Sequence, residues 1–296
     1  MIIPIMNSEK RGIIELTIAT FLFSLFGVFT RIIASQIGVF FQLWVRAAMM
    51  FVLFFMASYF MHEMKKVKSS DWGLLLLRGL LIIVDFSCFY YSVTHLPMNV
   101  TLFLFYASSL IFSYVTGLLI LKEKLTHTKT LSAIIAIIGL IIMFYGSLHG
   151  VALLPSLAAL LSGISFGLTT ITSKSLTSSY SSTQVNGIGY LSAFLLVMPV
   201  MFISQEVISF HQTLSLWITL IGFSFVGVGA FYLTLNGFKK LEVQKASLIM
   251  LAELLFTTLI GLLFYSEIPT VNTMIGGMCI LVALTLPNVV KAKYQT

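Results

Sequence analysis

Charged residues are scarce in this sequence. Lys, Arg, Asp and Glu together make up 9% of the 296 residues, while hydrophobic residues make up 58%. A soluble globular domain carries about 25% charged residues, so this chain has too little polar surface to cover a particle in water. Long apolar runs separated by short polar breaks instead indicate a helical membrane protein with many spans.

Motifs for enzyme chemistry are also lacking. The two cysteines, Cys88 and Cys279, lie inside apolar runs, which excludes a disulfide framework or a cysteine-based metal motif. The five histidines lie in loops or at span ends, none at a metal-binding spacing, and no Walker motif or paired phosphate loop is present. We therefore expect no enzyme activity, no metal and no cofactor. The net charge of +7 comes from Lys residues scattered through short loops, which argues against a nucleic-acid partner.

What the sequence does contain is a series of apolar segments. A membrane-spanning helix needs about 20 apolar residues, and the run after the N-terminus has no cleavage site, so it is kept as the first span. The pattern predicts an all-α membrane protein with ten transmembrane helices. Their ranges are 13–31, 39–61, 72–93, 98–121, 128–146, 151–173, 185–204, 214–236, 246–265 and 272–290.

Positive charge predicts the orientation of these spans, because Lys and Arg favour cytoplasmic loops. With the N-terminal side inside, outer segments hold only Arg31, so both termini are expected in the cytoplasm. The basic residues of the inner segments are Lys10, Arg11, Lys65, Lys66, Lys68, Lys122, Lys124, Lys129, Lys174, Lys239, Lys240, Lys245, Lys291 and Lys293.

The chain also repeats itself. "GLLILKEKLT" (117–126) returns as "GLLFYSEIPT" (261–270), an offset of 144 that places Glu123 on Glu267, and an offset of 145 places Trp72 on Trp217. This divides one membrane domain into halves of five spans each, 1–150 and 151–296. Because five is odd, the second half enters the membrane from the other side, which predicts an inverted-topology repeat.

With these motifs the sequence resembles the drug/metabolite transporter superfamily, EamA type. The fourth helix of each half ends in Gly-Leu-Leu…Glu, and "LLLRGLL" (75–81) and "FYYSVTHLP" (89–97) are similar to the family's third helix. Two departures are Leu110 and Leu254, where the family often has proline, and "FSLFG" (23–27), where Trp-Gly is common. The resemblance implies a secondary transporter of a bacterial inner membrane, with export and proton coupling.

Five ionisable residues fall inside predicted spans. Each costs at least about 2.5–3.5 kcal/mol to insert, so each is a functional candidate. None has a charged counterpart in the other half: for example, Asp85 aligns with Ala230 and Glu253 with Ser109. Charges present in only one half are better candidates for chemistry than for architecture. The five candidates for a substrate or proton site are Glu15, Arg46, Arg78, Asp85 and Glu253.

Alternatives stay open for each of them. Arg46 and Asp85 lie at similar depth and would form a structural ion pair, and Arg78 would extend to the inner interface or meet Glu15. Glu253 has no evident partner, which makes it the first choice for substrate or proton binding; the alternative is a protonated packing residue. Together the five carry a charge of −1, which favours a cationic or zwitterionic substrate, or exchange for a proton.

Polar and aromatic residues recur on single helix faces and are candidates for lining a cavity. Small and hydroxyl residues on such faces also act as ordinary helix-packing contacts, so that alternative remains. The candidates are Phe89, Ser92, Phe105, Ser108, Ser109, Tyr232 and Asn236.

The acids of the repeated motif are candidate gates. A carboxylate at a helix C-terminus opposes the helix dipole, at a cost of about 0.3–1 kcal/mol, so each acid calls for a nearby cation. The repeat predicts two related contacts, Arg31 with Glu267 outside and Lys174 with Glu123 inside. The alternative is that both acids simply end their helices in water.

The sequence therefore favours a secondary active transporter that moves a small metabolite, such as an amino acid or amine, by alternating access. Its expected partners are that solute, protons and the lipid bilayer. The alternative from another class is a non-transporting scaffold or subunit that uses its embedded charges to bind partner helices; a membrane enzyme is a more distant one.

Overall fold

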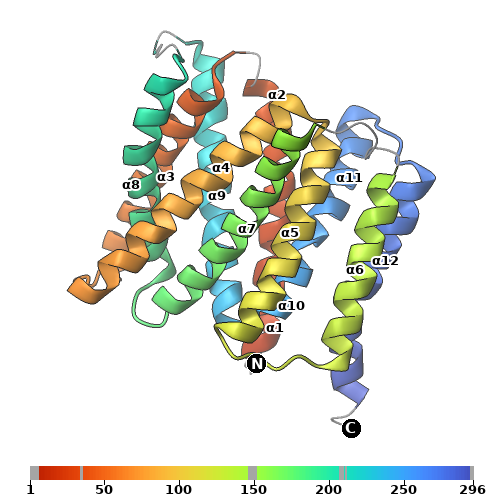
Figure 1. Cartoon of the computed structure of the whole chain (residues 1–296). Coiled ribbons are helices and arrows are strands. Elements are labelled where there is room, and N and C mark those ends of the chain that lie inside the picture. The colour runs from red at the N-terminus through yellow and green to blue at the C-terminus, as the bar shows by residue number, and fades with distance from the viewer. Residues whose placement is uncertain (1–6, 34–35, 146–151, 207–209, 211, 294–296) are drawn as a thin grey trace, which may run out of the picture.

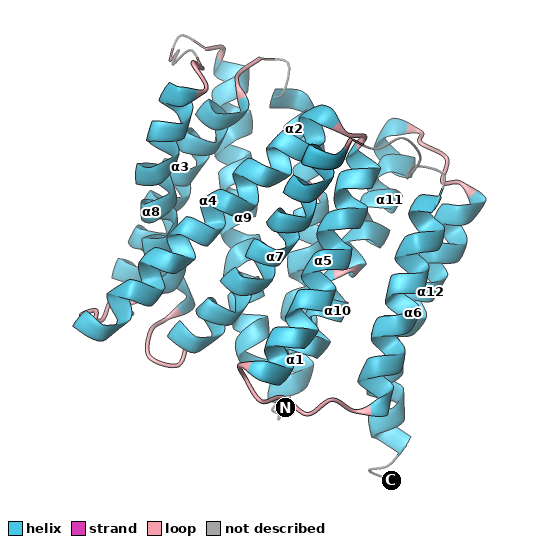
Figure 2. Cartoon of the chain, viewed as in Figure 1, coloured by secondary structure: helices cyan, strands magenta, loops and turns pink. Residues whose placement is uncertain are grey.

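The structure is a computed structural model that describes residues 7–33, 36–145, 152–206, 210 and 212–293. The side chains of Arg31 and of residues 288–293 also lie outside what it describes. Every regular element within these ranges is helical, as Figure 2 shows. The elements are α1 (Ser8–Ser24), α2 (Phe26–Ile33), α3 (Val39–Phe60), the short 3₁₀ helix η1 (Ser69–Asp71), α4 (Trp72–His95), α5 (Met98–Leu119), α6 (His127–Phe144), α7 (Leu153–Leu176), α8 (Ser182–Ile203), α9 (Leu214–Lys240), α10 (Val243–Met250), α11 (Ala252–Tyr265) and α12 (Val271–Lys293).

Nine helical stretches in the described part of the chain are long and apolar enough to cross a bilayer. Their outer surfaces carry large apolar side chains, such as Ile203 (82% exposed) and Leu214 (75% exposed). This inside-out pattern suits lipid, because hydrocarbon satisfies apolar side chains while each helix satisfies its own backbone. α12 contains a shorter apolar segment, Val271–Pro287, so the tenth crossing stays a prediction.

Two of these stretches are interrupted partway along. α1 passes to α2 at Leu25, and α10 passes to α11 at Leu251. At each break the backbone tightens to i→i−3 hydrogen bonds, from Leu25 N–H to the Leu22 carbonyl (3.2 Å) and from Leu251 N–H to the Leu248 carbonyl (3.0 Å). A tight turn inside a helix is a common place for bending.

The two halves run in opposite directions. Figure 1 shows α3 descending from the upper end while its counterpart α8 rises from the lower end, and α4 and α9 are likewise opposed. α1 begins and α12 ends at the lower end. We call that end the N-terminal face and the other the distal face. Their assignment to cytoplasm and exterior stays a prediction.

Helix ends repeat at the level of the backbone. Shortly after the ends of α3 and α8 the backbone turns left-handed at His62 (φ 54°) and Gln205 (φ 55°), 143 residues apart. The second pair, Lys122 after α5 and Ser266 after α11, lies 144 residues apart, and both have φ 54°. In all four cases a glutamate follows directly, and its N–H bonds back to the helix that has just ended. Left-handed residues other than glycine are uncommon, so this fourfold recurrence reflects the internal repeat.

The halves interlock rather than fold side by side. α3 packs on α8, α4 and α5 on α7, α1 on α9, and α6 on α12. Close approach needs glycine in places: a Cβ at Gly139 of α6 would lie 2.9 Å from the Gly276 carbonyl oxygen of α12. The protein interior is thus mostly an interface between the two halves, which is where transporters of inverted topology place their sites.

Candidate functional site

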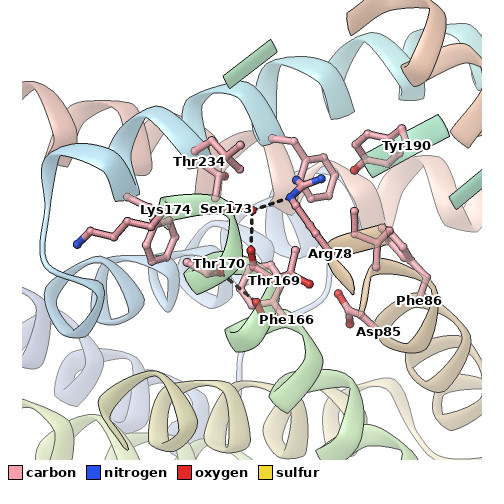
Figure 3. A pocket seen from close by; sticks show the side chains of 14 residues that line it. Arg78, Asp85, Phe86, Phe166, Thr169, Thr170, Ser173, Lys174, Tyr190 and Thr234 are labelled. Atoms are coloured by element: carbon pink, nitrogen blue, oxygen red, sulfur yellow. Dashed lines mark hydrogen bonds between the residues drawn. The ribbon is translucent and has the colours of Figure 1, made fainter. Parts of the chain in front are cut away.

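A small pocket lies where α4 of the first half meets α7, α8 and α9 of the second. Figure 3 shows Arg78 and Asp85 on one side of it, facing the hydroxyl groups of α7. The free space inside is about 30 Å³, roughly enough for two water molecules. The side chains that line it are those of Arg78, Ile82, Asp85, Phe86, Phe166, Thr169, Thr170, Ser173, Lys174, Tyr190, Phe231, Thr234, Leu235 and Phe238.

Arg78 is one of the largest fully buried side chains of the protein, at 1% exposure. Its guanidinium donates to Ser173 Oγ (2.7 Å), the Val185 carbonyl (3.1 Å) and Asn186 Oδ1 (2.7 Å). All three acceptors are neutral and belong to buried residues. Neither snorkelling nor a contact with Glu15 therefore describes Arg78, because its side chain turns across to α7 and α8.

Asp85 lies two turns beyond Arg78 on α4 and lines the same pocket. Its carboxylate accepts a hydrogen bond from Ser162 Oγ of α7 at 2.6 Å. The expected ion pair with Arg46 is not found among the residues that the structure describes. The prediction rested on the similar depth of the two residues in their helices. Arg46, however, lies on the face of α3 that turns toward α9.

α7 supplies hydroxyl groups along the whole contact with α4. Ser162 meets Asp85 at one end and Ser173 meets Arg78 at the other. Between them lie Thr169 and Thr170, and the buried Thr169 Oγ1 has no hydrogen-bond partner among the described residues. Sequence reasoning missed this row. Its signal was the density of Ser and Thr in 162–173, at spacings that keep them on one helix face.

Arg46 of α3 is also buried, at 2% exposure. Its guanidinium lies 3.4 Å from the centre of the Phe223 ring of α9 and 5.2 Å from that of Phe26. Tyr90 of α4 also interacts with it. The contact with aromatic faces is attractive, since the face of an aromatic ring carries negative potential.

Glu253 lies in the first turn of α11, directly after the break at Leu251. Its carboxyl group interacts with the side chain of Tyr106 of α5, which is 4% exposed. Glu253 thus sits at an interrupted helix, a position at which many transporters place their binding groups. The sequence gave no sign of Tyr106 as its partner, because the neighbours of the ninth span were unknown.

Glu15 is placed differently from the prediction. It lies near the N-terminal face, where it pairs with Arg11 of its own helix (3.1 Å) and Lys240 of α9 (2.5 Å). Beside it Lys245 pairs with Glu9 at 2.6 Å, and Lys129 pairs with Glu242. Glu15 therefore belongs to a layer of ion pairs that ties α1 and α6 to the α9–α10 connection, away from the pocket.

The predicted contact between Lys174 and Glu123 is present at the N-terminal face. Lys174 Nζ lies 3.1 Å from Glu123 Oε1 and donates to the Leu241 carbonyl at 2.7 Å. Glu123 also accepts from the backbone N–H groups of Val243 (2.8 Å) and Gln244 (3.3 Å). One carboxylate thus joins the end of α5, the end of α7 and the start of α10. Lys174 lines the pocket as well, so this contact adjoins the pocket.

The related distal contact, Arg31 with Glu267, falls on a side chain outside the described residues. Glu267 itself is described, and its backbone matches that of Glu123. The Glu267 N–H bonds to the Gly261 carbonyl at 3.1 Å, as the Glu123 N–H bonds to the Gly117 carbonyl at 2.9 Å. The Glu267 carboxylate also folds back over Gly261, where a Cβ would lie 2.8 Å from its Oε2. The two acids end their helices alike, whereas the outer ion pair stays a prediction.

Comparison with known families adds a decisive observation. The model of the EamA-like transporter family matches this chain twice, over residues 10–145 and 153–289. The chain belongs to the EamA-like transporter family. Membership places it in the drug/metabolite transporter superfamily, as the repeated Gly-Leu-Leu…Glu motif predicted. With its apolar helices it is an integral, multi-pass membrane protein.

Individual relatives agree with this EamA membership. A protein described as an uncharacterized transporter from Helicobacter pylori is 25% identical over 234 residues, 77% of this chain and 78% of that one. Another from Clostridium kluyveri is 24% identical over 230 residues, 74% of each. A solved crystal structure superposes with a TM-score of 0.81 at 14% identity, covering 97% of this chain and 100% of that one, which shows the shared fold. The two bacterial relatives are consistent with a bacterial inner membrane.

The seven candidate cavity residues of this EamA protein lie around the pocket rather than in its lining. Ser92 and Thr101 bond to each other at 2.9 Å, joining α4 to α5, and Ser182 donates to Asn236 at 2.7 Å. Phe89 packs edge-on against Phe105 with ring centres 5.5 Å apart. Ser108 caps backbone carbonyls of its own helix, Ser109 is buried, and Tyr232 is half-buried beside the α3–α8 core. These contacts fit the helix-packing alternative.

Two acids that sequence reasoning overlooked take part in helix capping. Glu206, after α8, accepts from the N–H groups of Phe40 (3.0 Å) and Phe41 (2.8 Å) at the start of α3. Its counterpart Glu63, after α3, accepts from Thr183 Oγ1 (2.6 Å) at the start of α8. Each half thus contacts the first turn of a helix of the other: Glu206 accepts from backbone N–H groups there, and Glu63 from a side-chain hydroxyl. The signal was the offset of 143, which aligns these two acids as the offset of 144 aligns Glu123 with Glu267.

Proposed function

We propose that this EamA protein is a secondary active transporter that carries a small metabolite with an amino group, such as an amino acid, an amine or a related zwitterion. The observation that supports it best is Asp85: an embedded carboxylate on the boundary between the halves, lining a pocket and held by a single hydroxyl group from Ser162. A carboxylate at this depth attracts a cationic group. The hydroxyl groups of α7 then supply hydrogen bonds to the rest of the solute.

Transport is proposed to occur by alternating access. Ligand pockets measure about 300–1,000 Å³, whereas the pocket here has about 30 Å³ of free space, so α4 and α7 must separate to admit a solute. At the N-terminal face that movement requires Lys174 to release Glu123. We infer that this ion pair is the inner gate, that Arg31 and Glu267 form the outer one, and that the breaks at Leu25 and Leu251 allow bending.

Proton coupling is proposed to use Glu253. Its carboxyl group, which interacts with Tyr106, lies inside the protein at an interrupted helix. Protonation would remove its charge and so lower the cost of moving α11 through an apolar interior. We infer from the basic residues on the N-terminal face that both termini lie in the cytoplasm. Export is inferred from the resemblance to the drug/metabolite transporter superfamily.

Efflux from proteoliposomes tests these proposals. Vesicles holding purified protein are loaded with a labelled mixture of amino acids and amines, and a pH gradient is imposed. We expect one or a few solutes to leave faster than from empty vesicles, and faster with a gradient. Glu253→Gln should keep transport but lose its dependence on pH, whereas Glu242→Gln, on the N-terminal face, should keep both. Unchanged pH dependence in Glu253→Gln would remove that residue from the mechanism, and protein that moves none of the solutes would contradict the proposed function.

A further inference from the structure

The two buried arginines occupy equivalent places in the two halves, although they do not align in sequence. Arg78 aligns with Phe223 at an offset of 145, and Arg46 aligns with Gly189 at an offset of 143. In the structure Arg78 of α4 lies against Gly189 of α8, and Arg46 of α3 lies against Phe223 of α9. These are the same helix contact in inverted copies. Each contact holds one guanidinium group. In the α4–α8 contact it comes from α4, the third helix of the first half, and in the α3–α9 contact from α3, the second helix of the first half.

Their depths mirror each other. Arg46 comes seven residues after the start of α3 at the distal face, and Arg78 six after the start of α4 at the N-terminal face. At 1.5 Å per residue each lies about 10 Å inside its own face. Tyr190, which lines the pocket, interacts electrostatically with both guanidinium groups. Arg78 itself lines the pocket, whereas Arg46 lies outside the lining and is linked to it through Tyr190.

Both arginines lack an anion. A guanidinium has five N–H donors, and Arg78 spends three on neutral acceptors. Among the described residues no carboxylate forms an ion pair with Arg46 or Arg78, and Arg46 Nε has no hydrogen-bond partner at all. Arginine stays charged in proteins, so each site holds a buried, uncompensated positive charge.

The other unsatisfied groups nearby are donors too. At the inner site Asn186 accepts from Arg78 through Oδ1, which fixes the orientation of the amide, and its buried Nδ2 has no partner within the described residues. At the outer site Gln42, one turn before Arg46 on α3, has an unpartnered Nε2. Orphaned donors beside an uncompensated cation call for an acceptor that carries negative charge.

We propose that Arg46 and Arg78 are two alternating sites for a carboxylate group of the transported compound, one on the side of each face. A carboxylate matches the planar guanidinium, and its single charge matches the single cation at each site, whereas a phosphate dianion would need more. Asp85, between the two sites along α4, is then placed for an amino group of the same molecule. This inference rests on the proposed function for the source of the carboxylate, but binding tests it without transport.

Matched pairs of compounds provide the test. Thermal unfolding of purified protein is followed with L-phenylalanine against phenethylamine, L-histidine against histamine and L-leucine against isoamylamine, with pyruvate and succinate in addition. Within each pair the members differ by the carboxylate alone. We expect at least one carboxylate compound to raise the unfolding temperature while its amine does not. Arg46→Lys and Arg78→Lys should each weaken that effect at least tenfold, and Arg11→Lys, whose side chain is exposed, should leave it unchanged.

A second variant guards against loss of folding. Asn186→Asp places a carboxylate beside Arg78, so it should keep or raise the unfolding temperature of the free protein while reducing the effect of the ligand. Equal shifts from acid and amine, no shift from any compound, or full shifts in both Arg→Lys variants would overturn the proposal. Shifts specific to carboxylates in protein that moves no solute would support these sites while contradicting transport, so the two failures are distinguishable.

Discussion

The two halves of this protein end their helices alike but carry different charges inside. At the ends, Glu63 matches Glu206 and Glu123 matches Glu267, each after a left-handed residue. Inside, Asp85 has only Ala230 opposite it in the repeat, and Glu253 has only Ser109. What both copies retain holds helices together. Asp85 and Glu253, present in one copy each, lie at the pocket and at an interrupted helix, where the proposed mechanism places the solute and the proton.

The arginines refine this comparison. By alignment alone each is unmatched, yet Arg46 and Arg78 fill the same helix contact in opposite copies. An inverted repeat is therefore compared better by contacts than by columns of an alignment. At a contact between two helices, either helix can supply the arginine. Two contacts related by the repeat can then each hold a guanidinium group although the arginines do not align in sequence.

The largest expected effect comes from an acid of the shared set. Glu123→Ala removes a carboxylate whose side chain is 7% exposed and that binds Lys174 and two backbone N–H groups. Loss of one partner of a buried, hydrogen-bonded pair costs about 3 kcal/mol. We expect the free energy of unfolding in detergent to fall by that amount. Glu242→Ala, at the half-exposed partner of Lys129, should change it by less than about 1 kcal/mol. Equal losses of unfolding free energy in the two variants would contradict a stabilising role of Glu123 beyond that of an exposed ion pair.

The next effect separates transport from stability. Asp85→Asn keeps the shape of the side chain and its contact with Ser162 but removes the charge. We expect solute efflux to fall at least tenfold, about 1.4 kcal/mol of binding energy. The unfolding temperature should change little, because no cation forms an ion pair with Asp85 among the described residues. Ser162→Ala, which keeps the charge, should reduce efflux less. If Asp85→Asn transports normally, unmatched charge does not mark the substrate site.

Sequence reasoning reached the contacts that the repeat implies and missed those that depend on helix rotation. The Lys174–Glu123 contact follows from the offsets of 143 and 144 residues between the halves, and from the need of an acid at a helix C-terminus for a nearby cation. Arg46 was paired with Asp85 because span depth was known while the face of α3 was not. Glu15 was expected in the interior because its partner Lys240 lies 225 residues away, beyond what local pattern shows. The Ser/Thr row of α7 does not stand out in the sequence, because small hydroxyl residues are common in the contacts between membrane helices.

A smaller effect is expected at Glu206. Glu206→Gln leaves one carbonyl oxygen for two N–H groups, Phe40 and Phe41, and removes the charge that favours a helix N-terminus. Loss of one charge-assisted hydrogen bond of this kind costs about 1–2 kcal/mol. Chemical denaturation in detergent would measure it. Hydrogen exchange at the start of α3 should rise in the same variant, since the freed N–H groups then open more often. Unchanged exchange there would contradict the capping role.

The smallest effect is expected at its counterpart. Glu63 accepts from the Thr183 hydroxyl, and the amide oxygen of Glu63→Gln still accepts that bond, so only its charge assistance is lost, at about 0.5 kcal/mol. Because α8 also begins with Ser181 Oγ accepting from the Gln184 N–H at 3.1 Å, its N-terminus keeps a cap without Glu63. α3 has Gly38 at the equivalent place and no side-chain cap of its own. The two Glu→Gln variants should therefore differ in stability by about 1 kcal/mol. Equal losses would mean that the acids act through general charge rather than through the helix ends they touch.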